Sequence, residues 1–334
     1  MAITGARKIQ LGRQSAFGTA VAATTIWGGK GLIEDGRVVK PVERQIGILQ
    51  PTLLSYVPEL GAKVSMDSYE ANFNELPHIF EAGIGAASVA SDGVGDGKIW
   101  AYPFPLTSQN TLKYYTIEMG DDVGCQEMSD AFVESFKISG NAREGLMVDA
   151  NWIGRNLADA TFSGGATAPT IVASDIIVFG GSKLYIDAPG GTIGTTEITK
   201  TLLSFELDVT TGLTAKATNE TKDYSLVYFN KDAFSVKLKM VYEHNTNAVA
   251  QRDIYEAATN RLIRLDFLGA AFGSAGTSFT NYTFRIDAAG VYDTFTYGDN
   301  DGNSTVEAEM ILGYDDVAAE GVELTVVNEL GSLP

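Results

Sequence analysis

The residue types that most often perform catalysis are scarce in this chain. It contains one cysteine, Cys125, and two histidines, His78 and His244. A cysteine beside a histidine could supply a thiolate nucleophile, but nothing in the local sequence supports such a pair. We therefore expect no catalytic residues, and we interpret Cys125 as a small, buried or half-buried side chain that forms no disulfide within the chain.

The best metal-binding pattern is G-D-N-D-G-N-S at 298–304. Asp299, Asp301 and Asn303 have the one-three-five spacing that delivers oxygen ligands to Ca²⁺. However, the sixth position of this loop is not glycine, and no glutamate stands at the twelfth. A hairpin or loop turn is therefore the favoured interpretation, and we predict no metal site and no cofactor.

Carboxylates recur at alternate positions of several runs in which apolar and polar residues alternate. Successive side chains of a strand point to opposite faces of a sheet, so these carboxylates belong to polar faces. A solvated wall is favoured over acid–base catalysis. The candidates are Glu118, Asp149, Glu206, Asp208, Glu307 and Glu309.

The clearest structural pattern is a hairpin at 131–153. Apolar residues alternate with polar ones in both of its runs, which are joined by the Gly/Asn-containing stretch 140–145. This pattern predicts two paired strands with one buried face and one wet face. Residues 303–327 repeat the plan, with runs at 306–312 and 322–326 joined by the turn 314–321. We therefore expect a second hairpin there.

Two short helices are expected beside these strands. The first contains Pro77 in its opening turn, where proline is tolerated, after a possible Asn72 or Asn74 cap. The second is predicted over 248–262, after Asn245 or Asn247. The residues expected to pack these helices against the sheets are Leu76, Ile79, Phe80, Ile254, Ala258 and Leu262.

The order of strands, long loop, strand, helix, strands and final hairpin occurs twice, at an offset of roughly 170–180 residues. We interpret the chain as mainly β (α+β), with two tandem β-sandwich or half-barrel domains that each carry one flanking helix. The predicted boundaries are 1–165 for the first domain, 166–182 for a linker of mostly small residues, and 183–334 for the second domain.

The segment 36–66 is a long stretch with three prolines and scattered apolar residues. A loop of this length within a compact domain is uncommon and is usually functional or an interaction arm. Its apolar side chains would be a liability unless another subunit covered them. The candidates for such contacts are Ile46, Ile48, Leu49, Leu53, Leu54 and Tyr56.

The formal net charge of −18 argues against nucleic-acid binding, which is driven by neutralisation of phosphates. No apolar run approaches the ~20 residues that span a bilayer, and the N-terminus lacks the apolar region of a secretory signal. We expect a protein made and folded in a cytoplasm that does not contact a membrane.

Several segments together resemble tail tube (major tail) proteins of long-tailed bacteriophages. They are R-Q-S-A-F-G-T-A-V-A-A-T-T-I-W (13–27), N-F-N-E-L-P-H-I-F-E-A-G-I-G (72–85), Y-Y-T-I-E-M-G-D-D (114–122), F-V-E-S-F-K-I-S-G-N-A-R-E (132–144), N-W-I-G-R (151–155), and 183–213 from K-L-Y-I-D to D-V-T-T-G-L. The resemblance covers most of the chain, and its weight comes from the order of motifs that are individually loose.

The resemblance implies a structural protein of the virion, assembled in the cytoplasm of a host bacterium. Rings of six β-sandwich-like domains would stack into a tube that carries DNA, and sometimes the tape-measure protein, without tight binding. If each chain holds two domains, three chains complete a ring. The six carboxylates named above would then line the lumen, and the apolar segment 41–60 would dock on the neighbouring ring.

Two other classes of function remain open. A β-rich receptor- or carbohydrate-binding module, such as a distal tail or adhesin protein, could use the 14 tyrosines and 3 tryptophans to stack on sugars. A metal-dependent hydrolase would depend on Asp299. Self-assembly, glycan binding and loss of stability on chelation distinguish the three.

Overall fold

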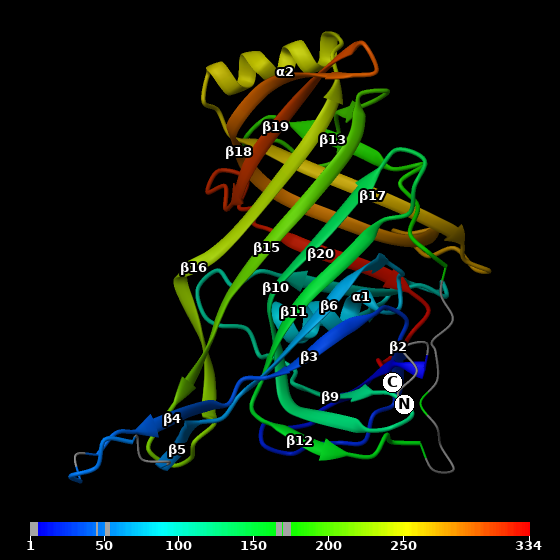
Figure 1. The fold of residues 1–334 in the computed structure, drawn as a ribbon. Coiled ribbons are helices and arrows are strands. Elements are labelled where there is room, and N and C mark those ends of the chain that lie inside the picture. The colour runs from blue at the N-terminus through cyan, green and yellow to red at the C-terminus, as the bar shows by residue number, and fades with distance from the viewer. Residues whose placement is uncertain (1–5, 45, 51–53, 165–168, 170–174) are drawn as a thin grey trace.

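The structure, a computed structural model, describes residues 6–44, 46–50, 54–164, 169 and 175–334 (Figure 1). It is mainly β, with 56% of residues in strands and 6% in two helices. All strands except β4 (Val38–Val42) and β5 (Leu54–Glu59) belong to one connected system of paired strands. No helix among the described residues is long and apolar enough to cross a membrane.

Eight antiparallel strands form the largest sheet, which we call the main sheet. Its pairings connect the strands in the order β3, β6, β11, β10, β15, β16, β19, β18. The bounds are β3 (Gly31–Asp35), β6 (Ala62–Glu70), β11 (Met147–Gly154), β10 (Cys125–Asn141), β15 (Leu202–Ala217), β16 (Tyr224–Glu243), β19 (Asn303–Gly313) and β18 (Asn281–Asn300).

The long strands β10 and β18 each leave the main sheet and enter a second one at their N-terminal ends. The start of β10 joins β2 (Thr25–Trp27), β1 (Lys8–Arg13), β9 (Tyr115–Gly120) and β12 (Leu157–Ala160). The start of β18 joins β14 (Glu197–Ile198), β13 (Lys183–Asp187), β17 (Arg261–Ala271), β20 (Glu323–Asn328), β8 (Lys98–Pro103) and β7 (Ser88–Ser91). Each of these two strands is therefore shared by the main sheet and a second sheet.

The pairings of the first half recur in the second. Strands β1, β2, β3, β6, β9, β10, β11 and β12 are connected to one another in the same way as β13, β14, β15, β16, β17, β18, β19 and β20. The helices α1 (Leu76–Gly83) and α2 (Thr246–Glu256) follow the equivalent strands β6 and β16. Among the described strands, β7 and β8 have no counterpart, whereas the far ends of β15 and β16, from Leu213 and up to Phe229, pair with each other in the places that β4 and β5 take beside β3 and β6.

The repeat extends to individual rows of core residues. In the first half, Phe136 of β10 lies opposite Ala150 of β11, which lies opposite Met66 of β6. In the second half, Phe295, Ala308 and Met240 occupy the same places in β18, β19 and β16. A one-residue irregularity in the pairing precedes both phenylalanines, between Val133 and Ser135 of β10 and between Tyr292 and Thr294 of β18.

The two halves nevertheless share one core. Strand β10 pairs with β15 and β8 pairs with β20, so strand pairing joins the halves in two places among the described residues. Buried residues of both halves form one contiguous apolar cluster. Within the predicted linker 166–182, Ile177 and Phe179 are buried in this cluster, and Phe179 stacks on Phe205. The predicted domains 1–165 and 183–334 are thus not packed as separate cores.

The predicted first hairpin is confirmed as β10 and β11, but the predicted second hairpin is wrong. Strands β19 and β20 correspond to its two runs, yet β19 pairs with β16 and β18, whereas β20 pairs with β18 and β8. The true counterpart of the first hairpin is β18 with β19. The alternating pattern identified the strands correctly but could not identify their partners, because periodicity defines faces only.

Helix α1 lies in the centre of the molecule. All eight of its residues are buried, including the predicted packing residues Leu76, Ile79 and Phe80. Phe80 contacts Phe136 of the first half and Phe284 of the second, so α1 is covered from both sides. Its predicted contribution to packing is confirmed.

Helix α2 differs from its prediction at the C-terminal end. Asn245 caps it as expected, accepting hydrogen bonds from the N–H groups of residues 247 and 248. The helix ends at Glu256 rather than at 262, and Ala258 follows it, exposed and with a φ of 48°. Leu262 is buried in β17, and only Ile254 packs from α2 against the core as predicted.

Candidate functional site

Two of the three candidate catalytic residues, His78 and Cys125, are buried. Burial lowers the pKa of His78 to about 3, and its Nδ1 lies 3.0 Å from the hydroxyl of Tyr115. Burial also raises the pKa of the Cys125 thiol to about 11, which disfavours the thiolate. Both residues are therefore components of the core near neutral pH.

The calcium-like stretch 298–304 forms the turn between β18 and β19. Asn300 pairs with Asn303, and Asp301 and Gly302 between them have φ values of 54° and 80°. Positive φ at both central residues defines the two-residue hairpin turn for which Asp-Gly is favoured. Asp299 accepts a hydrogen bond from the N–H of Gly302. Within the described part of the chain, no three His, Cys, Asp or Glu residues are grouped to hold a metal ion.

Five of the six predicted carboxylates lie together on the outer face of the main sheet, which we call the charged face. Asp149 of β11 and Asp208 of β15 are the Cα partners of Lys137 in β10. Glu206 forms an ion pair with the same lysine at 2.8 Å. Glu309 and Glu307 of β19 pair with Lys237 and Lys239 of β16, each at 2.7 Å.

Charge alternates from strand to strand across this face. Glu34 of β3 lies opposite Lys63 of β6 at one end, before the acidic position of β11 and the lysine of β10. Acids follow on β15, lysines on β16 and acids on β19. The last strand, β18, presents threonines, with Thr296 opposite Glu307. Since each carboxylate has a lysine on a neighbouring strand, the face is a mixed array with a modest surplus of negative charge.

The same array shifts the pKa of its partly buried members. Burial raises the pKa of Asp149, the nearby Asp208 and Glu206 raise it further, and Lys137 opposes them. The pKa of Lys137 is raised mainly by its hydrogen bond to Glu206. The lysines therefore stay charged and neutralise part of the acidic surface.

Glu118 does not belong to the charged face. It lies in β9, is 1% exposed, and accepts hydrogen bonds from the backbone N–H and the hydroxyl of Ser163. Its alternating sequence pattern is that of the other candidates, but both faces of β9 are covered. In the chain as described, Glu118 is a structural residue.

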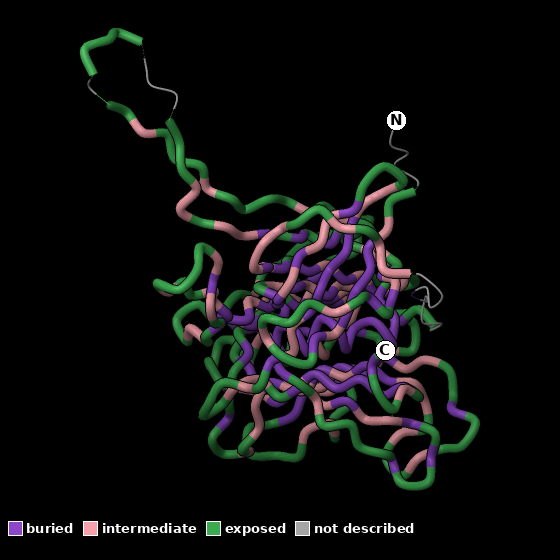
Figure 2. Tube along the Cα trace, turned by 90° about the horizontal axis from the view of Figure 1, so that it is seen from below, coloured by how far each residue is buried: buried purple, intermediate pink, exposed green. Residues whose placement is uncertain are grey.

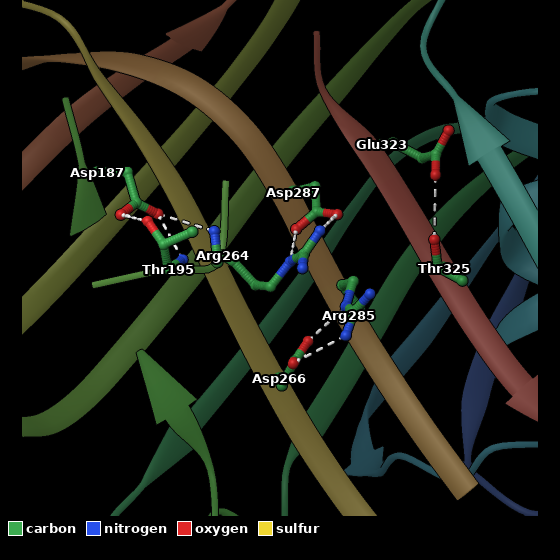
Figure 3. A network of polar contacts seen from close by, with 9 residues as sticks. Asp187, Thr195, Arg264, Asp266, Arg285, Asp287, Glu323 and Thr325 are labelled. Carbon is green, nitrogen blue, oxygen red and sulfur yellow. Dashed lines mark hydrogen bonds and ion pairs between the residues drawn. The ribbon is translucent and has the colours of Figure 1, made fainter. Parts of the chain in front are cut away.

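A second polar network, which was not predicted from the sequence, lies on β17 and β18 (Figure 3). Arg264 binds Asp287 through two contacts of 2.7 Å, and Arg285 binds Asp266 through contacts of 2.6 and 2.9 Å. The signal was present as R-L-D at 264–266 and R-I-D at 285–287, because antiparallel pairing places each arginine opposite an aspartate. Bidentate arginine–aspartate pairs of this kind fix the register of the two strands.

The predicted interaction arm is a two-stranded hairpin, β4 with β5, that projects from the body (Figures 1 and 2). Its apolar candidates are exposed in this single chain: Ile46, Ile48, Leu49, Leu54 and Tyr56. Leu49 is the extreme case, with full exposure. Leu53, also predicted as a contact residue, lies outside the described residues. The arm therefore presents apolar side chains that no described residue of its own chain covers.

The main sheet has two free edges among the described residues. Strand β3 pairs only with β6, and β18 beyond Gly290 pairs only with β19. Followed pairing by pairing, the strand system branches at β10 and β18 and never returns to its starting strand. Free edges of this kind are templates for pairing with another chain.

No protein-family model matches the chain, and no curated protein is similar to it at a significant level.

Proposed function

We propose that this protein is a structural subunit of a bacteriophage tail tube. Three chains form a ring of six equivalent halves, and rings stack around a channel that conducts DNA to the host. The observation that carries this proposal is the composition of the main sheet. Four of its strands come from the first half and four equivalent strands from the second, joined side by side through β10 and β15.

The internal joint supports ring formation because it shows how one half accepts the next. The last strand of the first unit, β10, pairs with the first strand of the second unit, β15. At the two ends of the main sheet, the outer edges of β18 beyond Gly290 and of β3 have no strand partner among the described residues. Repeating the internal arrangement around an axis consumes both edges, and closure removes the aggregation hazard of open sheets.

The charged face supports a channel lining. Its six carboxylates exceed its four lysines: Glu34, Asp149, Glu206, Asp208, Glu307 and Glu309 against Lys63, Lys137, Lys237 and Lys239. The lysines of β10 and β16 are bound to carboxylates and are therefore poor partners for phosphate. A surface of this kind repels DNA weakly and does not retain it.

The arm supports stacking. It carries its exposed apolar residues away from the body, where they can reach a neighbouring ring (Figure 2). Burial of such a patch against a second subunit would remove the liability that it represents in the single chain.

Electron microscopy and native mass spectrometry of the purified chain test this function. We expect rings of three chains, and tubes at high concentration. Particles that stay monomeric at high concentration would refute the proposal. Binding to a glycan array without self-assembly would favour a receptor- or carbohydrate-binding module instead.

A further inference from the structure

The internal joint between β10 and β15 has a defined register. Lys137 lies opposite Asp208, and Ile138 lies opposite Leu207. The core-facing pair is fully buried, and the other pair lies on the charged face. This joint therefore shows how two successive units meet, residue by residue.

The residue rows connect this joint with the free edges. Phe295 is equivalent to Phe136, since each lies opposite an alanine that itself lies opposite a methionine. Gly31 is equivalent to Phe205, because each is the next residue in its row, opposite Met66 and Met240 respectively. Residues 136–141 and 205–209 of the internal joint thus have counterparts on β18 and β3.

We infer that β18 of one chain pairs antiparallel with β3 of a second copy in one specific register. Thr296 lies opposite Glu34 of the second copy, as Lys137 lies opposite Asp208. Tyr297 lies opposite Ile33, as Ile138 lies opposite Leu207. The inference rests on the ring proposed above and identifies the partner strand and the alignment.

The exposed side chains at both edges fit this register. Tyr297 is 55% exposed and Leu32 is 52% exposed, so both side chains are free to contact a second copy. In the inferred register Leu32 faces Gly298, which has no side chain to obstruct it. A depression of about 450 Å³ lies beside β3 and is lined by Leu32, Ile33 and Met119 among others. It leaves space at this edge for side chains of the second copy.

Helix α2 points to the same partner. It packs on Phe295 through Tyr255, just as α1 packs on the equivalent Phe136 through Phe80. The far side of α1 is covered by the other half of the chain, whereas Val249 and Tyr255 of α2 remain 39% and 36% exposed. The chain that supplies β3 would cover α2 as well.

Disulfide cross-linking tests the register. In a Cys125→Ala background, Thr296→Cys with Glu34→Cys should give a covalent trimer on a non-reducing gel after mild oxidation. The two positions lie at opposite ends of an eight-stranded sheet, roughly 34 Å apart along it, so they cannot join within one chain. The pair Gly298→Cys with Leu32→Cys tests the neighbouring row in the same way.

Two variants serve as matched controls. Lys137→Cys with Asp208→Cys is the equivalent pair inside the chain and should oxidise within the monomer, which confirms that this geometry permits a disulfide. Thr296→Cys with Ile33→Cys shifts the register by one residue and places the thiols on opposite faces. It should give little covalent trimer.

The outcomes separate this inference from the function. Threefold rings in which only the shifted pair cross-links, or neither pair does while the internal control oxidises, would overturn the register and leave the tube function standing. Covalent trimers that never stack would uphold the register and count against a tube. Chains that fail to associate at all would overturn both.

Discussion

The joint between chains lacks a charge that the internal joint has. Inside the chain, Lys137 of β10 lies opposite Asp208 and near Glu206. In the inferred joint, the equivalent of Lys137 is Thr296, which lies opposite Glu34 of the next chain. Thr296→Lys should therefore restore the alternation of charge across the joint and strengthen the ring.

The size of the effect follows from the exposure of the groups. An opposite-charge pair placed directly across two antiparallel strands contributes about 0.2–1 kcal/mol, and exposed ion pairs fall in the same range. A ring of three chains contains three such joints, so assembly should gain about 0.6–3 kcal/mol in total. This corresponds to a roughly 3- to 150-fold larger trimer association constant.

Sedimentation or mass photometry across a concentration series would measure the trimer association constant. The gain should disappear in about 1 M salt, where the screening length is only about 3 Å. Because Thr296 also lies opposite Glu307 of its own chain, part of any gain could arise within the subunit. The double variant with Glu34→Gln isolates the intermolecular part, and Thr296→Glu should weaken the ring. An equal gain with and without Glu34 would refute the register.

Three further predictions concern the single chain and the stacking of rings. Burial raises the pKa of Glu75 to about 7 from 4.5, so its contribution to the free energy of unfolding is complete below pH 4.5, falls as pH rises through 7, and amounts to about 3 kcal/mol. Urea unfolding at pH 5 and 8 should show this loss in the wild type and not in Glu75→Gln. The same change in unfolding free energy between the two pH values in both proteins would contradict the prediction. Arg13→Ala leaves the fully buried carboxylate of Glu81 without its 2.6 Å ion pair and should cost about 3–5 kcal/mol of unfolding free energy, whereas a loss below 1 kcal/mol would show that water replaces the arginine. Ile48→Ser with Leu49→Ser should abolish tubes in electron micrographs while rings persist, because these exposed residues belong to the arm and not to the main sheet. Unchanged tubes would show that the arm does not take part in stacking.

Sequence patterns predicted most of the local structure for identifiable physical reasons. Alternation placed Phe136 and Trp152 on buried faces, because the pleat of a strand has a strict period of two. The apolar spacing predicted both helices, and Asn245 caps α2 as expected. The expected cap of α1 by Asn72 or Asn74 was wrong, because Glu75 precedes the helix and makes no side-chain cap, and the end of α2 was also wrong. There, left-handed Ala258 ends the helix, and no glycine or proline signalled that end.

The pairing partners of the strands were harder to predict from the sequence than the strands themselves. The run from 322 to 326 alternates as well as any other, yet β20 crosses to β18 and β8 instead of returning along β19. The stronger hairpin signal was the Asp301-Gly302 pair, whose positive φ values match the twist of two antiparallel strands. A hairpin or loop turn was expected there, but the strands that it joins, β18 and β19, were not recognised as a pair.

The exact repeat of the two halves was hidden for a geometric reason. Met66 and Met240 are 174 positions apart, but the equivalent Ala150 and Ala308 are 158 apart. The β7–β8 hairpin, present only in the first half, interrupts any comparison at one fixed offset. Only pairing in space aligns the rows.

The rows of equivalent residues also show which positions differ between the two halves. The equivalent core-facing positions of β10 and β18 both hold phenylalanine, Phe136 and Phe295, and each packs on an aromatic ring of a helix. The edge positions Lys137 and Thr296 differ, since one edge is joined within a chain and the other is not. A joint inside the chain forms once, during folding, at a high effective concentration. A joint between chains must also remain soluble while it is still open, which favours a short, polar edge such as β3 and a threonine-lined β18.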